Sequence, residues 1–371
     1  MASAHFFNDI YMGFLTPLYP IVMQKYGLSL SVVGAVSMAA ALASALSQPF
    51  FGMLFDRFGG TASVWLAPLL TAVLVSALGV APTLPVFLLL LCLGCLGSAA
   101  FHPRGASITP SLSGSHPEFG MAVFSAGGNL GFAAGPAVIA FFISVWGFHS
   151  TPILAVPAAV LAGTLALLMP RGSRARGSGT TVRLRTLLAN RRDLAMLGRL
   201  VFINFALTVG VRGLSTFLPV YMAQRGSPVT SIGALFTGML ALGAVASVFV
   251  SQLSRRTGKR SLILVSAALG APLAVAGYLV FPSAAGVVLI IAAGTVLTFS
   301  NPLLILMAQK HSGNSPAMAS SLIMGVSWGL AGLAMVPLGG LGEAMGIPAM
   351  MVICGAFPLL SVVSCLRIPR D

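Results

Sequence analysis

Long apolar stretches separated by short polar connections dominate the chain. A helix that crosses a bilayer needs about 20 mostly apolar residues. Twelve stretches reach that length, at approximately residues 4–25, 30–55, 61–81, 84–107, 117–145, 149–169, 195–224, 229–253, 261–281, 284–309, 315–341 and 346–367. One long polar segment, Arg171 to Asp193, divides them into six and six. The pattern predicts an all-α integral membrane protein with twelve transmembrane helices.

The two halves are related by an internal repeat. Residues 15–59 recur without a gap as residues 214–258, 199 positions later. Identical pairs include Pro20 and Pro219, Gly27 and Gly226, Gly34 and Gly233, Arg57 and Arg256, and Gly59 and Gly258. Many transporters are built from duplicated helical units, with the substrate site where the repeats meet. The repeat therefore favours a transporter.

The polar segment between the repeats sets the expected domains. Its Gly, Ser and Arg content is typical of a flexible linker. We expect an N-terminal six-helix bundle at residues 1–170, a basic cytoplasmic linker at 171–193 and a C-terminal six-helix bundle at 194–371.

Composition excludes a soluble protein. The chain is 57% hydrophobic and 7% charged, with a mean hydropathy of +0.99. Soluble domains carry about 25% charged residues. Because so few charges cannot cover a surface that faces water, lipid must be the solvent for most of this protein.

The net charge of +14 suggests nucleic acid at first, but its distribution indicates a membrane orientation. By the predicted segments, 16 of the 20 Lys and Arg lie on one side, two lie within helices, and only Lys25 and Arg225 lie on the other side. Cytoplasmic loops carry such an excess. We therefore expect a multi-pass protein of the cytoplasmic (inner) membrane with both termini in the cytoplasm. Its basic loops would meet anionic lipid and need no nucleic acid partner.

A loop motif identifies a family resemblance. Residues 52–59 read GMLFDRFG, which resembles the G-x-L-x-D-R-x-G signature of the major facilitator superfamily between helices 2 and 3. The second copy, residues 251–258, has Arg255 where the first has Asp56. The resemblance implies two six-helix bundles that work by alternating access, with an acid–base pair that latches the gate. The gating residues expected from these two loops are Gly52, Asp56, Arg57, Gly59 and Arg256.

Three further segments resemble fosmidomycin-resistance-type transporters. They are His5 to Leu15, Ala100 to Pro103, and Phe124 to Pro136. The resemblance implies export of a drug in exchange for protons. The chain departs from that branch in having Arg104 where an acid usually follows the His-Pro pair. In the antiporter signature of helix 5, Ile139 and Ala140 replace the final glycines.

Acidic residues are scarce, which singles out Asp9. The six acids are Asp9, Asp56, Glu118, Asp193, Glu343 and Asp371. Only Asp9 lies well inside a predicted span, and a charge there costs roughly 2.5–3.5 kcal/mol on insertion scales, so it is a functional candidate by default. Asp9 would carry the coupled proton, or form a permanent ion pair. His5 lies one helical turn earlier and would relay the proton, or remain a solvated histidine at the helix end.

Arg212 is the corresponding base of the second half. It falls in the middle of helix 7, opposite Gly13 in the repeat. Its guanidinium would pair with Asp9, or hold a phosphonate or carboxylate through two hydrogen bonds. The alternative is an arginine that extends to the membrane interface.

Other polar or aromatic residues within spans are expected to contact the substrate. With Arg212, this set comprises Asn8, Tyr11, His102, Arg104, Asn129, Asn204, Asn301 and Trp328. Arg104 would equally belong to the cytoplasmic basic residues, and the two asparagines of helices 5 and 7 would equally join helices by hydrogen bonds. Helix 5 also carries Gly127, Gly131 and Gly135 at four-residue spacing before Pro136. That stripe predicts close helix packing, a gating hinge, or both.

No catalytic, nucleotide-binding or metal-binding motif is present in the sequence. We therefore expect no enzymatic activity, no cofactor and no metal, and a monomer whose partners are a small-molecule substrate, protons and lipid. The favoured function is export of a small drug-like or anionic compound in exchange for protons. Two alternatives stay open: uptake or facilitated diffusion of an organic anion or metabolite, and a transporter-like protein for membrane assembly or sensing.

Overall fold

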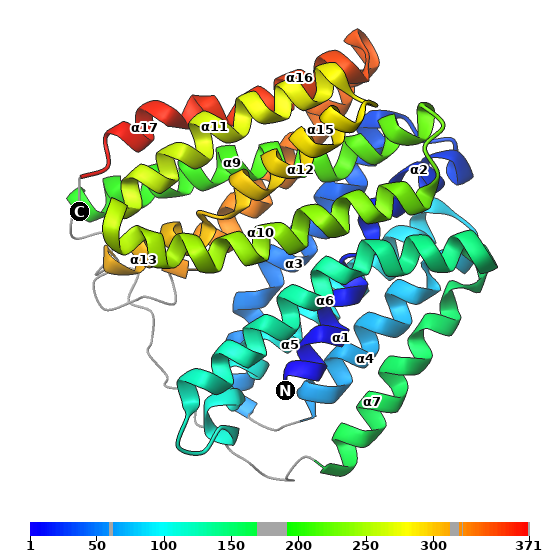
Figure 1. The fold of residues 1–371 in the computed structure, drawn as a ribbon. Helices are drawn as coiled ribbons and strands as arrows, with labels where there is room; N and C mark the ends of the chain where they lie inside the picture. Colours follow the sequence, from blue (N-terminus) through cyan, green and yellow to red (C-terminus); the bar gives the residue numbers. More distant parts are fainter. Residues whose placement is uncertain (59–61, 169–190, 312–318, 321, 370–371) are drawn as a thin grey trace. The chain divides into compact units, whose positions relative to one another are not determined.

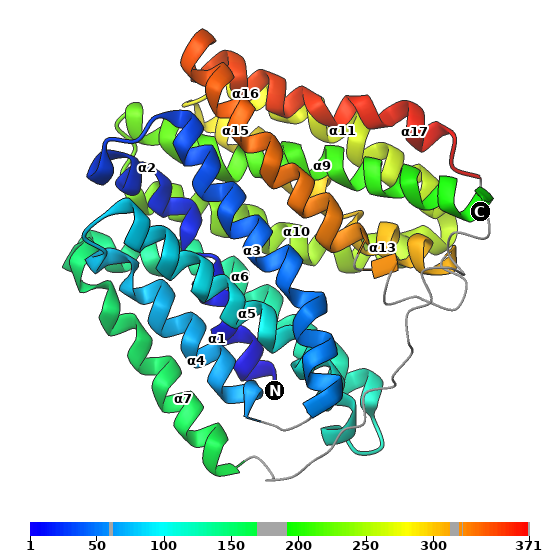
Figure 2. The same cartoon turned by 180° about the vertical axis from the view of Figure 1, so that it is seen from behind.

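The computed structural model describes residues 1–58, 62–168, 191–311, 319–320 and 322–369. Every regular element in these ranges is helical (Figures 1 and 2). The side chains of Gly52, Asp56 and Arg57 lie outside the description, as does the whole of Gly59. The predicted gate latch therefore stays a prediction.

The helices follow the predicted spans closely. In the first half they are α1 (Ala2–Met12), α2 (Leu15–Tyr26), α3 (Leu30–Phe58), α4 (Ser63–Ser76) with the 3-10 turn η1 (Ala77–Val80), α5 (Leu84–Leu112), α6 (Pro117–Trp146), the 3-10 segment η2 (Phe148–Leu154) and α7 (Ala155–Leu168). In the second half they are α9 (Arg191–Gln224), α10 (Val229–Thr257), α11 (Lys259–Val280), α12 (Ala284–Thr298), α13 (Asn301–Lys310), the π-helical turn η3 (Leu322–Val326), α15 (Ser327–Met345), α16 (Ile347–Ala356), the 3-10 turn η4 (Phe357–Ser361) and α17 (Val362–Leu366). Since α9 begins at Arg191, the last three residues of the predicted linker are helical.

Eleven segments among the described residues are long and apolar enough to span a membrane. The predicted first span is not one of them, because it breaks at Gly13 into α1 and α2. A Cβ on Gly13 would lie 2.7 Å from the carbonyl oxygen of Phe132. Only glycine lets the chain approach α6 this closely. The all-helical membrane architecture is confirmed, with a discontinuous first helix.

The chain forms two compact units that do not coincide with the sequence halves. The described parts of unit 1 are residues 1–18, 43–58, 62–168 and 228–237. Unit 2 contains the remaining described residues, including 19–42 of the first half. The segment Tyr19–Leu42, which contains most of α2 and the first part of α3, thus packs with the second half. The division into bundles at the linker follows the repeat and stays a prediction.

In unit 1, α1 is surrounded by α4, α5 and α6 (Figures 1 and 2). Gly127, Gly131 and Gly135 of α6 lie against the carbonyl oxygens of Ala2, Phe6 and Ile10 in α1. A Cβ on Gly127 would be 2.5 Å from the Ala2 oxygen. The close packing predicted from the glycine spacing is confirmed, and α1 is its partner. A gating role for this stripe and Pro136 stays a prediction.

In unit 2, α9 occupies the central place and contacts α12, α15 and α16. It buries one apolar set that includes Ile203, Val209 and Phe217. The first helix of each half thus packs against at least three other helices of its unit.

Candidate functional site

Asp9 and His5 meet on one face of α1. Because residues four apart in a helix lie one above the other, the two side chains point to the same place, and His5 Nε2 lies 3.2 Å from Asp9 Oδ2. Both side chains are largely removed from solvent, with exposed fractions of 11% and 15%. The predicted pairing of His5 with Asp9 is present in the structure.

His102 reaches the same carboxylate from α5. Its Nε2 lies 3.5 Å from Asp9 Oδ1 and 3.4 Å from the hydroxyl of Ser98, one turn earlier on α5. The sequence predicts His102 as a substrate contact, whereas the structure brings it to Asp9. We refer to His5, Asp9 and His102 as the His–Asp–His cluster.

The His5 ring is held in place by α6. Its Nδ1 lies 2.8 Å from the backbone carbonyl oxygen of Phe124, and the two rings stack with centroids 4.1 Å apart. Gly128 lies directly against the imidazole, since a Cβ there would be 2.7 Å from His5 Cδ2. The ring therefore has one available position.

This geometry determines where protons can be. A carbonyl oxygen only accepts hydrogen bonds, so His5 Nδ1 carries a hydrogen and donates it to Phe124. In neutral His5, Nε2 is then an acceptor that faces another acceptor, Asp9 Oδ2. The contact is favourable only when one proton lies between them, on the imidazole or on the carboxyl group. The pair is thus a site for one exchangeable proton.

Asn8 orients the carboxylate. Its side chain is 0% exposed, and its amide nitrogen donates to Asp9 Oδ1 at 2.8 Å and to Ser98 Oγ at 2.9 Å. Its carbonyl oxygen accepts from Thr71 Oγ1 at 3.4 Å. Both donor hydrogens of the amide are engaged within the protein, so this environment favours a positioning role over the expected substrate contact.

The cluster also has the composition of a metal site. The two imidazole nitrogens and one carboxylate oxygen lie within 4.8 Å of one another. Imidazole and carboxylate ligands suit transition metals. Ion-pair contacts of 3.2 and 3.5 Å join the two histidines to Asp9 and account for this geometry with protons alone, and a chelator control separates the two in any transport assay.

Unit 2 contains the predicted anion-binding arginine. The guanidinium carbon of Arg212 lies 5.4 Å from the centre of the Trp328 ring, a cation–π distance. Its Nη1 is 3.4 Å from the hydroxyl of Ser37, which in turn lies 3.0 Å from Thr216 Oγ1. Two of the expected substrate contacts, Arg212 and Trp328, are thus brought together. Asp9 belongs to the other unit, so the predicted Asp9–Arg212 pairing stays a prediction.

The repeat reappears as matching hydrogen bonds. Asn204 of α9 donates through Nδ2 to the carbonyl oxygen of Ile323 at 2.7 Å. His5 and Phe124 stand 199 positions before Asn204 and Ile323, so in both halves a side chain of the first helix bonds to a backbone carbonyl at the corresponding later position. This contact gives Asn204, which is 2% exposed, the helix-joining role that the sequence left open.

The titratable groups do not repeat. Thr208 stands 199 positions after Asp9, and Asn301 stands 199 positions after His102. The side chain of Thr208 is buried, and the amide oxygen of Asn301 is buried without a hydrogen-bond partner. The second repeat keeps polar groups at all three positions of the cluster, but none of them ionises.

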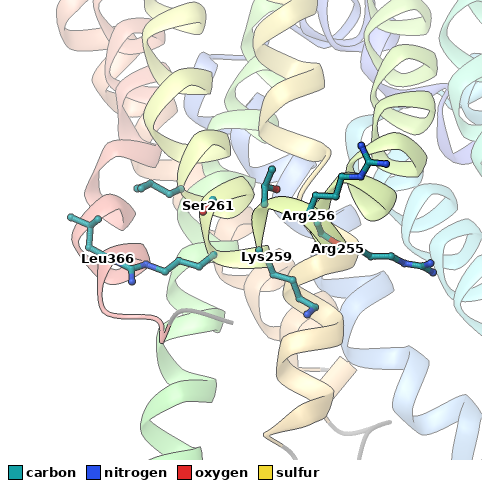
Figure 3. Close-up of a pocket in the computed structure, with 10 residues that line it drawn as sticks. Arg255, Arg256, Lys259, Ser261 and Leu366 are labelled. Carbon is teal, nitrogen blue, oxygen red and sulfur yellow. The ribbon is translucent and has the colours of Figure 1, made fainter.

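The remaining candidates are not among the residues described above. The hydroxyl of Tyr11 donates to the Leu154 carbonyl at 2.5 Å. Arg104 is 2% exposed within unit 1, so it is an interior residue and does not belong to the solvated basic loops. Asn129 is exposed on α6. Arg256 lines a surface pocket at the end of α10 (Figure 3).

Sequence reasoning missed several residues of the site. Ser98 could have been found from its spacing, because it precedes His102 by one helical turn. Thr71 and Ser37 have no such signal, since they reach the site from other helices. Phe124 contributes a backbone carbonyl, which no side-chain pattern reports.

Comparisons with known proteins agree with this architecture. Residues 1–336 match the Major Facilitator Superfamily. The chain is 24% identical to the fosmidomycin resistance protein of Escherichia coli (strain K12), over 98% of this chain and 90% of that protein. It is 26% identical to the uncharacterized MFS-type transporter YfnC of Bacillus subtilis (strain 168), over 99% and 91%.

Solved structures show the same fold. A crystal structure of a mutant of the nucleoside transporter NupG superposes with a TM-score of 0.80 at 14% identity, covering 98% of both chains. A bacterial homologue of the human lysosomal transporter Spinster gives a TM-score of 0.72 at 17% identity, covering 98% of this chain and 94% of that one. The chain is therefore a membrane transporter, not an enzyme, and it belongs to the major facilitator superfamily.

Proposed function

We propose that the protein exports a small anionic or drug-like compound in exchange for protons, and that the His–Asp–His cluster carries the proton. The 3.2 Å contact between His5 Nε2 and Asp9 Oδ2 is the observation that carries this proposal, because it puts an imidazole nitrogen and a carboxylate oxygen at ion-pair distance, where they can share one proton. Asp9 is also the one acid well inside the predicted spans.

Proton loss at the cluster would act on helix packing. Without the shared proton, His5 and Asp9 present lone pairs to each other at close range, and the pair separates. His5 and Asp9 both belong to α1 and His5 is held against α6, so loss of the proton would act on the contact that Asp9 makes with His102 and would change how α1 packs against α5. Protonation would thereby bias a packed helix pair between two arrangements, which is what coupling requires.

Arg212 would supply the anion-binding group. A guanidinium offers two parallel hydrogen bonds to a phosphonate or carboxylate, and the Trp328 ring beside it offers an apolar, aromatic surface. Such a pair suits compounds that combine an acidic group with an apolar body. The named relatives favour drugs, since they include the fosmidomycin resistance protein and, at 23% identity over 58% of this chain, the quinolone resistance protein NorA of Staphylococcus aureus (strain MSSA476).

The same proposal places the protein in the cytoplasmic membrane with both termini in the cytoplasm. It rests on the distribution of Lys and Arg, whose excess lies on the side of the predicted linker. Export then means movement toward the side that carries only Lys25 and Arg225. Alternating access would be latched by Asp56 and Arg57.

Everted membrane vesicles with an acid interior test this function. Fosmidomycin and a panel of other anions and drugs are added in the presence of EDTA, and the pH gradient is followed with a fluorescent dye. Exchange predicts that a transported compound dissipates the gradient in wild type and leaves it intact in Asp9→Asn. If Asp9→Asn still transports the compound while Arg212→Ala does not, uptake or facilitated diffusion of an anion replaces antiport.

A further inference from the structure

The turn between α10 and α11 forms a basic pocket in unit 2 (Figure 3). Its volume is about 680 Å³, and four cations line it: Arg255, Arg256, Lys259 and Arg260. None of its lining residues is acidic. The pocket therefore has a strongly positive field and selects for an anion.

The repeat shows that this charge is a specific gain of the second half. The positions 199 residues earlier are Asp56, Arg57, Gly60 and Thr61, which sum to zero charge. The second copy replaces the acid by Arg255 and adds Lys259 and Arg260, which gives four positive charges. The segment that carries one acid and one base in the first repeat thus corresponds to a turn that carries four bases in the second.

Two structural features add to the field. α11 begins at Lys259, directly after Gly258, whose φ of +79° directs the chain into the helix and whose missing side chain provides no cap. The first turn of a helix leaves N–H groups without intrahelical acceptors and carries the positive end of the helix dipole. The 22-residue helix α11 therefore points its positive end into the basic turn.

The shape of the site favours a lipid over a small free ion. Figure 3 shows Arg255, Arg256 and Lys259 leaving the turn in different directions, so they spread positive charge over an area wider than a small ion. Leu264 of α11 and the half-exposed Leu366 of α17 provide an apolar side to the pocket. A charged headgroup above an apolar body matches this arrangement, and basic pockets at helix ends bind such headgroups in membranes.

We propose that this turn binds the phosphate headgroup of an anionic phospholipid, with the lipid's glycerol and acyl region against Leu264 and Leu366. The site is separate from the His–Asp–His cluster and from Arg212. Its occupancy therefore does not depend on whether the protein exchanges protons.

Lipid titration of the purified protein tests the site. Delipidated protein in a neutral detergent is titrated with phosphatidylglycerol or phosphatidylcholine, and bound lipid is counted by native mass spectrometry. Inorganic phosphate and glycerol 3-phosphate are added as soluble competitors. The test variant is Arg255→Gln/Arg260→Gln. The matched control is Arg191→Gln/Arg192→Gln, which removes the same charge from the exposed first turn of α9 in the same unit.

The site predicts that wild type and the control prefer phosphatidylglycerol, and that the test variant binds it about thirty-fold less tightly, as expected for two surface cations. Equal binding of the two lipids by wild type would overturn the proposal. An equal loss of phosphatidylglycerol affinity in the test and control variants would also overturn it, because the loss would then follow from net charge and not from this turn. Displacement of the lipid by millimolar inorganic phosphate would assign the pocket to a soluble phosphate.

Discussion

The first helices of the two repeats, α1 and α9, share a structural bond and differ in chemistry. In α1, His5 bonds to the Phe124 carbonyl, and in α9, Asn204 bonds to the Ile323 carbonyl. Each bond is buried, and each fastens a central helix to its neighbour. Asp9 has no acidic counterpart, because Thr208 occupies the equivalent position.

This difference distinguishes the side chains that helix packing requires from those that proton exchange would require. An asparagine satisfies the carbonyl as well as a histidine does, so the fold alone does not require an imidazole at residue 5. A threonine is accepted at the position of Asp9 in the other repeat. We therefore expect the ionisable groups of the first repeat to serve the proposed proton exchange, and α9 is a natural control for α1.

The largest expected effect follows from removing the acid. Asp9→Asn keeps the size and hydrogen-bonding capacity of the side chain but cannot release a proton, so proton-driven exchange should fall to the level of vesicles without the protein. The repeat-related Thr208→Val should retain exchange. Gradient dissipation in everted vesicles measures both, and equal activity in Asp9→Asn and wild type would move the proton site elsewhere.

The second effect concerns the arginine that stands opposite Gly13 in the repeat. Arg212→Ala should weaken binding of anionic compounds roughly 10- to 150-fold, because hydrogen bonds to a charged group contribute about 1.5–3 kcal/mol. Arg212→Lys should fall between, since it keeps charge but loses the planar fork. Binding to purified protein is compared with Arg199→Ala on the same helix, and a similar loss in that control would dismiss Arg212 as the anion site.

The third effect is on packing. Gly131 lies against the Phe6 carbonyl of α1, whereas Leu330 occupies the equivalent place in the second repeat. Gly131→Ala should destabilise the protein by about 1–3 kcal/mol through overpacking. Gly163→Ala on α7 is the matched control, because nothing lies within 4 Å of the added methyl group. Thermal unfolding in detergent compares them, and equal midpoints would refute tight packing at α6.

The smallest effect dissects His5 itself. His5→Asn imitates Asn204 and should preserve the bond to the Phe124 carbonyl, whereas His5→Ala removes it and leaves that carbonyl only its bond within α6. Unfolding free energies should differ by about 0.5–1.5 kcal/mol in favour of asparagine. Both variants should slow proton exchange. If His5→Asn were as unstable as His5→Ala, the similarity between the repeats would be coincidental.

The sequence was enough to predict the helices, the repeat and the His5–Asp9 pair, because each follows from the spacing of residues along the chain. It did not bring His102 to Asp9, since that contact depends on how α5 packs against α1. It also read Asn8 as a substrate contact, because a polar side chain within a span gives the same signal whether it faces a cavity or a neighbouring acid. The break at Gly13 has a local signal that the span prediction did not use, because Pro17 has no N–H to bond the Gly13 carbonyl four residues earlier. The close approach of Gly13 to the α6 backbone has no such signal in residues 4–25.

The most direct test of the shared proton is a count of protons released on substrate binding. Purified protein in weakly buffered detergent solution is mixed with a compound that dissipates the gradient, and the pH change is read with an indicator dye. The account predicts release of about one proton per molecule from wild type and from Thr208→Val, and none from Asp9→Asn. Undiminished release from Asp9→Asn would contradict it.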